Sequence, residues 1–178
     1  LAAVDRTALA AVLPAIKRDL LLSDTQLGLL TGIAFSAFYA LFGLPLAGWA
    51  DRRNRRNLLC FAVLFWSLAT AATGLARGFV QLASARMLVA VGEAGGVPAA
   101  HSLLSELTPV NRRPMIFAVH SAAAPLGALI GLAGVGILAD LFDWRTSFFA
   151  LGLAGLPVLG LVALWLPEPR QMAIPAAD

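Results

Sequence analysis

Six apolar stretches follow one another along the chain, and most of them are about as long as a bilayer is thick. A membrane-spanning helix needs about 20 consecutive apolar residues, because each residue advances about 1.5 Å through a hydrocarbon core about 30 Å thick. With 60% hydrophobic and 13% charged residues, the chain differs from soluble domains, which carry about 25% charged residues. The sequence therefore predicts an all-α membrane protein with six transmembrane helices. The expected helices cover residues 1–16, 27–50, 58–76, 79–107, 115–139 and 147–166.

The first stretch, residues 1–16, is apolar from its first residue. No basic segment precedes it and no small-residue cleavage site follows it, which argues against a signal peptide. We interpret this stretch as a truncated spanning helix. The transmembrane bundle is then expected to cover residues 1–166. The proline-containing residues 167–178 are expected to form a cytoplasmic linker toward a missing carboxy-terminal bundle.

Basic residues are shared unevenly between the two sides of the predicted bundle. The connections after the second, fourth and sixth helices carry seven lysines and arginines, whereas the other connections carry four. Because cytoplasmic loops are enriched in these residues, both ends of the chain are predicted to face the cytoplasm. We expect a multi-pass protein of the cell membrane, namely the bacterial inner membrane. The seven are Arg52, Arg53, Arg55, Arg56, Arg112, Arg113 and Arg170, and the four are Lys17, Arg18, Arg77 and Arg145.

A short motif recurs half a chain length apart. Ala50-Asp51 ends the second predicted helix before a cluster of arginines, and Ala139-Asp140 ends the fifth before Arg145, 89 positions later. This spacing indicates two copies of three helices each. Because three is an odd number, the second copy crosses the membrane in the opposite direction, which gives a 3+3 inverted repeat. Ala-Asp is also common at helix ends without any repeat.

Four charged residues lie inside the apolar stretches. Asp5 and Arg6 are in the first stretch, and Arg86 and Glu93 are in the fourth. Charges at bilayer depth are costly, so they usually pair, face a polar cavity and mark a transport route. Arg86 and Glu93 are two turns apart on one helix face, which permits a network with Asp5 and Arg6. The alternative is that these pairs only fix helix packing.

Few side chains are candidates for carrying protons. A buried carboxylate beside an arginine can be tuned to gain and lose a proton near neutral pH, so Asp5 and Glu93 are the candidate proton-coupling residues. His120 is a candidate relay at about the depth of Glu93, although a hydrogen-bonded packing histidine fits as well, and His101 is a weaker candidate. The histidine spacing and the single cysteine predict neither a metal site nor a disulfide, and no cofactor is expected.

The connection after the second helix carries a recognisable motif. Residues 43–56 read GLPLAGWADRRNRR and resemble the G-x-x-x-D-R-x-G-R-R signature of the major facilitator superfamily. Ala47 replaces the first glycine of that signature, and Asn54 replaces the glycine of the turn. Because asparagine tolerates the left-handed conformation, we expect the turn to be kept. The resemblance implies one six-helix half of a twelve-helix fold, with a gate motif at Asp51, Arg52, Arg55 and Arg56.

The fourth helix carries a second motif. Residues 86–99, RMLVAVGEAGGVPA, resemble the Arg-x5-Gly signature of the same superfamily. Their GEAG segment, with DRT at 5–7 and LSDTQLG at 22–28, is most similar to the spinster-like branch, which includes lipid exporters. The resemblance implies that Asp5 and Glu93 are protonation sites. The expected charge partners or substrate contacts are Arg6, Arg86, His120 and Tyr39.

These features together predict a proton-coupled secondary transporter that moves a small amphipathic or lipid-like solute by alternating access. The alternatives are a sugar or organic-anion transporter of another branch, and a non-transporting membrane receptor or scaffold. No Ser/His pair, intramembrane aspartate pair or His-Glu metal motif indicates an enzyme. The expected partners are the substrate, protons, the carboxy-terminal half and membrane lipids. No nucleic acid is expected, because the arginines gather at helix ends instead of on one basic face.

Overall fold

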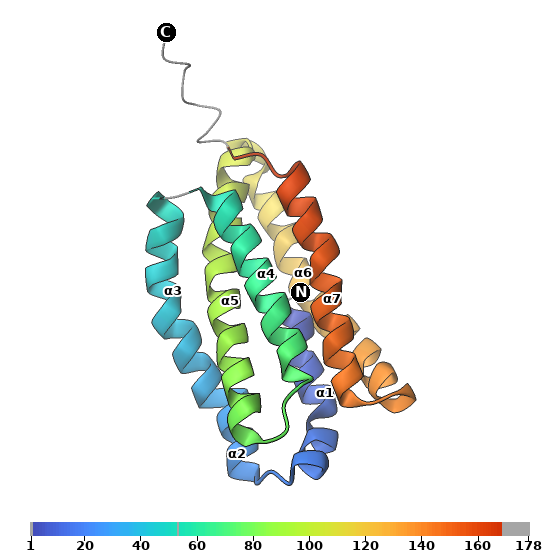
Figure 1. The fold of residues 1–178 in the computed structure, drawn as a ribbon. Coiled ribbons are helices and arrows are strands. Elements are labelled where there is room, and N and C mark those ends of the chain that lie inside the picture. Colours follow the sequence, from blue (N-terminus) through green and yellow to red (C-terminus); the bar gives the residue numbers. More distant parts are fainter. Residues whose placement is uncertain (1, 53, 169–178) are drawn as a thin grey trace.

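The computed structural model describes residues 2–52 and 54–168, and these residues form a bundle of long helices without a strand (Figure 1). A π-helical turn at Leu29–Ile33 joins the short α2 to α3, so that these three elements form one continuous rod. A 3-10 turn at Val110–Arg112 leads into α6. The helices are α1 (Ala2–Leu20), α2 (Asp24–Gly28), α3 (Ala34–Arg52), α4 (Arg55–Thr73), α5 (Phe79–Leu107), α6 (Arg113–Leu141) and α7 (Trp144–Trp165).

The predicted helices are confirmed with shifts of a few residues at their ends. Within the described residues, five helical segments are long and apolar enough to cross a membrane, namely 24–50, 55–73, 79–107, 110–141 and 144–165. The 19-residue α1 is not among them. It carries Asp5 and Arg6 near its start and Lys17 and Arg18 in its last turn, and these charges lower its hydropathy. The first predicted helix therefore owes its place in the bundle to packing more than to hydropathy.

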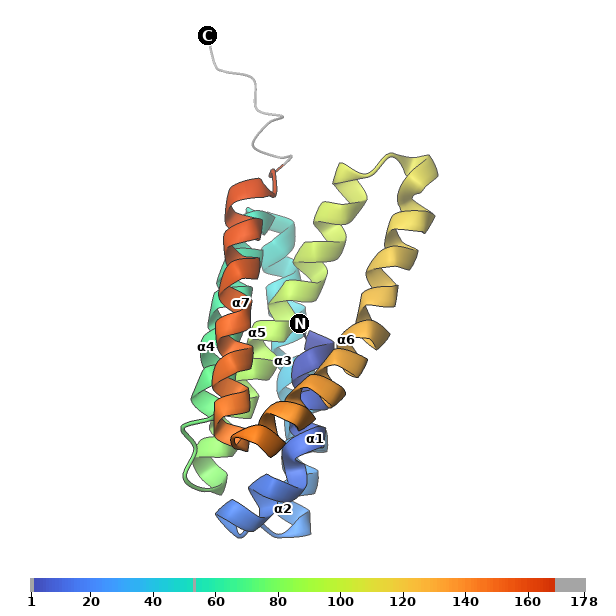
Figure 2. The same cartoon turned by 90° about the vertical axis from the view of Figure 1, so that its right-hand side faces the viewer.

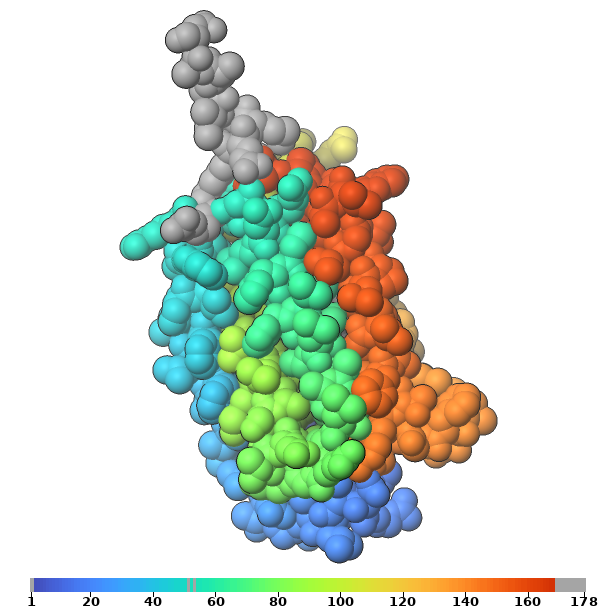
Figure 3. Space-filling view, viewed as in Figure 1, coloured from blue at the N-terminus to red at the C-terminus, as the bar shows by residue number. Residues whose placement is uncertain are grey.

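Part of the helix packing agrees with the predicted repeat, whereas the extensive α4–α5 contact has no equally extensive counterpart between α1 and α7. α4 packs against both α5 and α7, while α1 runs along α6 and α3 runs along α5. In a repeat of three helical rods, α1 corresponds to α5, and the rod that contains α3 corresponds to α6. The α1–α6 contact in one direction is therefore equivalent to the α5–α3 contact in the other. Figure 2 shows α6 leaning across α1, and Figure 3 shows α4 between α3 and α7 on the opposite face.

Two glycines allow the closest helix contacts. A Cβ atom on Gly131 of α6 would lie 2.8 Å from Val4 Cα and would overlap Thr7 Oγ1 on α1. A Cβ atom on Gly155 of α7 would overlap the side chain of Ser67 on α4. Small residues let helices approach closely where lipid gives no hydrophobic driving force for association. The position of α1, which carries Asp5, therefore depends on residue 131 being a glycine.

Polar side chains fix several helix starts. Ser23 and Gln26 form a reciprocal capping box at the start of α2. Asp143 accepts a hydrogen bond from the Thr146 amide at the start of α7, and this bond lowers the pKa of Asp143 below its usual range.

The structure corrects the expectation for Asn54. Its φ and ψ are −65° and 112°, so its backbone is extended instead of left-handed. The Asn54 side chain accepts a hydrogen bond from the Asn57 amide and caps α4. The connection is therefore kept by helix capping, with no left-handed residue at this position.

Candidate functional site

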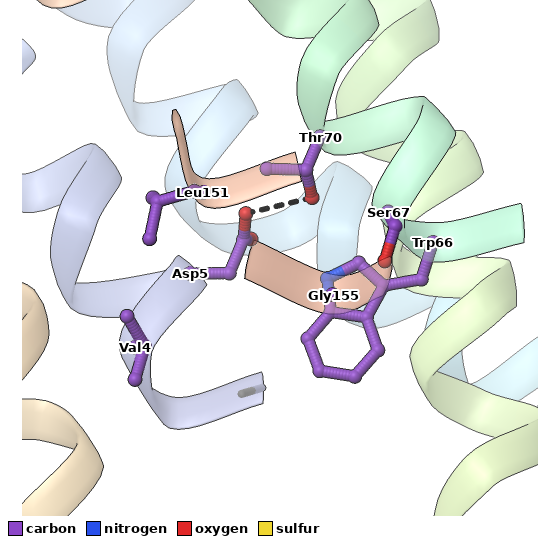
Figure 4. A pocket seen from close by; sticks show the side chains of 7 residues that line it. All are labelled: Val4, Asp5, Trp66, Ser67, Thr70, Leu151 and Gly155. Carbon is purple, nitrogen blue, oxygen red and sulfur yellow. Dashed lines mark hydrogen bonds between the residues drawn. The ribbon is translucent and has the colours of Figure 1, made fainter. Parts of the chain in front are cut away.

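The four charged residues predicted at membrane depth form two ion pairs between α1 and α5. Arg86 Nη1 donates to Asp5 Oδ2 at 2.6 Å, and both side chains are buried, with 4% and 3% of their surfaces exposed. Asp5 Oδ1 also accepts a hydrogen bond from Thr70 Oγ1 of α4 at 3.0 Å (Figure 4). The Asp5 carboxylate is thus held by two helices besides its own.

The second pair is Arg6 with Glu93, and it is less symmetrical. Arg6 donates from Nε and Nη2 to the same Glu93 oxygen, Oε2, at 2.9 and 2.7 Å. The Glu93 side chain has no exposed surface, whereas 49% of the Arg6 side chain is exposed. The predicted contact of each carboxylate with Arg6 or Arg86 is therefore confirmed. The predicted roles of these residues are not tested by their positions.

Each pair leaves one buried polar atom unused. Among the described residues, neither Arg86 Nε nor Glu93 Oε1 has a hydrogen-bond partner. A buried polar atom without a partner costs about 1–3 kcal/mol and is rare in folded proteins; Arg55 Nε is another example in the described part of this chain. Glu93 can therefore accept a further hydrogen bond or a proton at Oε1 without first losing Arg6.

Aromatic rings of α3 cover the two arginines. The Arg6 guanidinium lies 5.1 Å from the ring centroids of both Phe35 and Tyr39, and that of Arg86 lies 5.4 Å from Phe35. An aromatic face attracts a cation at such distances without neutralising it. Tyr39 thus lies beside Arg6 as a ring contact. Phe35 bridges the two arginines.

Two open grooves border the charged residues. The first, here called the arginine groove, has a volume of about 290 Å³ and is lined by Arg6, Arg86, Thr31, Phe35 and Ser36, among others. The second, here called the histidine groove, has a volume of about 470 Å³ and is lined by Glu93, His120, Trp66 and mainly apolar residues. Arg6 borders one groove and its partner Glu93 borders the other, so a change in this pair can affect both.

A much smaller cavity lies beside Asp5. Its volume is about 10 Å³, which is about the space of one water-sized probe. Figure 4 shows the Asp5 carboxylate directed at Thr70, with Ser67 and Trp66 of α4 nearby. In contrast to Glu93, Asp5 therefore borders almost no free space.

His120 lies apart from both ion pairs and contacts the other histidine. The ring centroids of His101 on α5 and His120 on α6 are 5.1 Å apart, and Phe117 also lies edge-on to His101 at 5.5 Å. Both histidines are exposed. No group of three or more His, Cys, Asp or Glu residues in the described ranges is arranged to hold a metal ion.

A second buried charge cluster lies at the arginine-rich end of the bundle. Arg55, which is fully buried, donates to both carboxylate oxygens of Glu106 at 2.6 and 2.7 Å and to Ser102 at 2.9 Å. It also donates to Glu168 Oε1 at 2.8 Å. The other oxygen of Glu168 accepts hydrogen bonds from the backbone amides of Arg55 and Arg56 at the start of α4.

Comparison with known proteins assigns the chain to a family. Residues 1–177 match the profile of the Major Facilitator Superfamily. The chain belongs to this superfamily. An MFS-type efflux pump of Mycolicibacterium smegmatis is 36% identical over 174 residues, which cover 98% of this chain and 40% of that protein. The hexuronate transporter of Bacillus subtilis is 35% identical over 174 residues, which cover 98% of this chain and 41% of that protein.

Solved structures agree with this assignment. The chain is similar to a crystal structure of a bacterial homologue of the human lysosomal transporter Spinster in an inward-facing and occupied conformation, with a TM-score of 0.83 and 35% identity. That match covers 94% of this chain and 42% of the other. The chain thus spans about two fifths of the length of its relatives. The predicted half of a major facilitator fold and the similarity to spinster proteins are confirmed, and the chain is part of a multi-pass membrane protein.

The superfamily's gate motif is only partly described by the structure. The side chain of Asp51 lies outside the described part, so its role in the gate motif stays a prediction. Arg52 is exposed, whereas Arg55 is fully buried in the cluster with Glu106 and Glu168.

Nothing in the sequence marks Glu168 as a partner of Arg55. This glutamate falls in the predicted linker, because prolines flank it at positions 167 and 169. The free backbone amides at the start of a helix attract a carboxylate. Here these amides belong to α4, which is far from Glu168 in the sequence, so the sequence does not show that the two come together. Thr70 was also missed, because a neutral residue in an apolar stretch carries no cost that would mark it.

Proposed function

We propose that the complete protein is a secondary transporter in which Glu93 couples proton binding to solute movement by alternating access. The observation that carries this proposal is the Arg6–Glu93 pair, in which the carboxylate is buried, the guanidinium is half-exposed, and the two members border different grooves. A protonated Glu93 is neutral, so Arg6 loses its ion-pair partner, although Glu93 Oε2 can still accept a weaker hydrogen bond from the guanidinium. Protonation on one side of the pair therefore leaves the Arg6 charge uncompensated on the other side.

The charge of Arg6 indicates which kind of solute the arginine groove would bind. Arg6 and Arg86 stay charged at all physiological pH values, and both line the arginine groove beside the ring of Phe35. Such a site suits an acidic group attached to an apolar body, so we propose a small amphipathic or lipid-like solute with an acidic group. A sugar acid or organic anion is the second candidate, and similarity to the hexuronate transporter favours it.

Asp5 is proposed as a second protonation site with a different task. Its carboxylate holds Arg86 and Thr70 and borders almost no free space. Protonation of Asp5 would therefore require movement between α1 and its neighbours, whereas Glu93 has an unused oxygen. We therefore propose that Glu93 exchanges its proton faster, and that protonation of Asp5 is coupled to the movement of α1 against its neighbours.

The remaining parts of the proposal concern the whole protein. The carboxy-terminal half of the same chain is proposed to supply the other wall of the solute cavity, as in carriers whose halves rock about a central site. The excess of arginine at the ends of α3 and α5 supports a cytoplasmic location for that end of the bundle. The bacterial inner membrane is the proposed location.

Proton flux in liposomes tests this function. The full-length protein would be reconstituted with a pH-sensitive dye inside, and sugar acids and acidic amphiphiles would be added outside. Solute-driven pH changes are expected for wild type and should be lost in Glu93→Gln, because the amide keeps shape and hydrogen bonding but cannot titrate. Glu106→Gln, on the same helix but in the other cluster, should retain solute-driven pH changes. Normal proton movement in folded Glu93→Gln protein would contradict the proposal.

A further inference from the structure

We propose that His120 and His101 form a proton path that connects the arginine-rich end of the bundle with Glu93 through the histidine groove. This inference rests on the proposed function, because it assumes that Glu93 exchanges a proton. It adds the route by which the proton arrives, and it gives separate tasks to the two grooves. The arginine groove takes the solute, and the histidine groove takes the proton.

The histidine groove follows one face of α5. Glu93, Gly96, Val97 and Ala100 all line it, and their spacing of three, four and seven residues places them on the same side of the helix. Seven residues span about 10 Å along the axis, and the next residue is His101. Gly96 and Ala100 have little or no side chain, which leaves space along this face. The groove therefore leads from the level of Glu93 to the level of the histidines.

The volume of the groove suits a chain of waters. A water molecule occupies about 30 Å³ in the liquid, so a groove of about 470 Å³ has room for several. Glu93 lines the groove but its side chain has no exposed surface, so small motions of the surrounding side chains must let water reach the carboxylate. Its oxygen Oε1 has no hydrogen-bond partner among the described residues and is available to accept the proton.

Few titratable groups compete for this path. Glu93 and His120 are the titratable residues among those that line the groove, while α1, α4 and α7 contribute residues such as Ala2, Leu59 and Val162. His101 faces His120 from α5, and the other ring in contact with His101 is that of Phe117. A histidine can bind and release protons near neutral pH, which makes it suited to a relay.

The proposed transfer moves one proton and neutralises one charge. A hydronium ion at the exposed His101 gives its proton to an imidazole nitrogen, and the proton passes to His120 next to it. The other nitrogen of His120 releases a proton to groove water, and an O–H bond forms at Glu93 Oε1. Each imidazole ends neutral, and the carboxylate ends as a carboxylic acid. Arg6 then loses its charged partner.

Infrared difference spectroscopy after a pH jump tests this path without knowledge of the solute. The full-length protein in lipid nanodiscs would be acidified, and the carbonyl band of protonated Glu93 would be assigned by its absence in Glu93→Gln. We expect the band to grow at least about tenfold more slowly in His120→Ala than in wild type, in line with the size of general acid–base effects. Added imidazole should restore the rate, whereas pyrazole, a ring of the same size that stays unprotonated near neutral pH, should not.

Gly96→Val gives an independent variant that keeps both titratable groups. A Cβ at this position meets only Leu59 Cδ1 at 3.9 Å, so the fold should tolerate the valine while the groove narrows. Slower growth of the Glu93 band is expected, and imidazole should not restore it. A rate equal to wild type in His120→Ala, or a slow rate that imidazole leaves unchanged, would overturn the path. Absence of the Glu93 band in wild type would instead overturn the proposed function.

Discussion

The bundle contains two clusters of arginine and glutamate or aspartate, each with a buried arginine and a buried carboxylate, and they differ in whether a buried carboxylate oxygen is left without a hydrogen bond. At membrane depth, Arg86 makes one hydrogen bond to Asp5, and both bonds from Arg6 go to a single oxygen of Glu93. At the arginine-rich end, Arg55 binds both oxygens of Glu106 and also reaches Glu168.

Under the proposed function, we expect this difference to separate an ion pair that exchanges a proton from one that fixes structure. A bidentate arginine–carboxylate pair combines two charge-assisted bonds in one geometry, and Glu168 adds bonds to helix amides. Opening such a cluster breaks several bonds at once. In the Arg6–Glu93 pair, by contrast, one carboxylate oxygen has no hydrogen-bond partner among the described residues. We therefore expect an unused carboxylate oxygen to indicate fast proton exchange better than burial does.

Arg55→Ala is expected to give the largest loss of stability. It leaves Glu106 and Glu168 without this cation, and removing one partner of a buried ion pair typically costs about 3–5 kcal/mol. The free energy of unfolding of the full-length protein in detergent, measured by denaturant titration, should fall by that amount. Glu93→Gln should change it much less, because the neutral amide can still accept a bond from Arg6.

Arg52→Ala is the matched control for this comparison. Arg52 lies in the same connection and is exposed, so its loss should change stability by less than about 1 kcal/mol. If Arg52→Ala destabilised the protein as much as Arg55→Ala, the loss would come from the charge of the connection as a whole. The stability effect could then no longer be attributed to the buried Arg55 cluster.

Gly131→Ala is expected to affect the membrane cluster and spare the other. A methyl group at this position would overlap α1 next to Asp5, and overpacking of this kind costs about 1–3 kcal/mol. The displaced α1 should also weaken both ion pairs and reduce proton flux in liposomes. Gly134→Ala, one turn along α6, has no atom within 4 Å of the added Cβ and should behave as wild type. Equal effects of the two alanines would exclude the close α1–α6 contact as the cause.

The sequence predicted the helices and the presence of the membrane cluster well, because both depend on the cost of placing single residues in a bilayer. Placing an apolar residue in the bilayer is favourable and placing a charged residue there is costly, and both effects can be read from the residue type alone. Which arginine pairs with which carboxylate was not predictable, since the predicted depths of the four charged residues permit several pairings. The structure selects one of them, Asp5 with Arg86 and Arg6 with Glu93.

The second cluster was harder to predict for a physical reason. Arginines near helix ends are expected on topological grounds, so nothing in the sequence marks Arg55 as buried and Arg52 as exposed. Glu168 reaches Arg55 only because the end of α7 lies beside the start of α4. Such contacts depend on tertiary packing. They follow from the fold and leave no local pattern in the chain.

Glu168→Gln should have the smallest effect, and acid should remove it. Burial of the Glu168 carboxylate opposes its ionisation, but hydrogen bonds from Arg55 and from the Arg56 amide outweigh burial and lower the pKa of Glu168. The folded state therefore binds fewer protons than the unfolded state near the ordinary glutamate pKa of about 4.3, so ionised Glu168 stabilises the fold above that pH. Denaturant titrations should show wild type more stable than Glu168→Gln at pH 7, with the difference shrinking as the pH falls below about 5. In an Arg55→Ala background the pH-dependent difference should be much smaller. A difference that persisted unchanged into acid would mean that Glu168 stabilises the bundle by packing, and the second cluster would then no longer differ from the first through its charges.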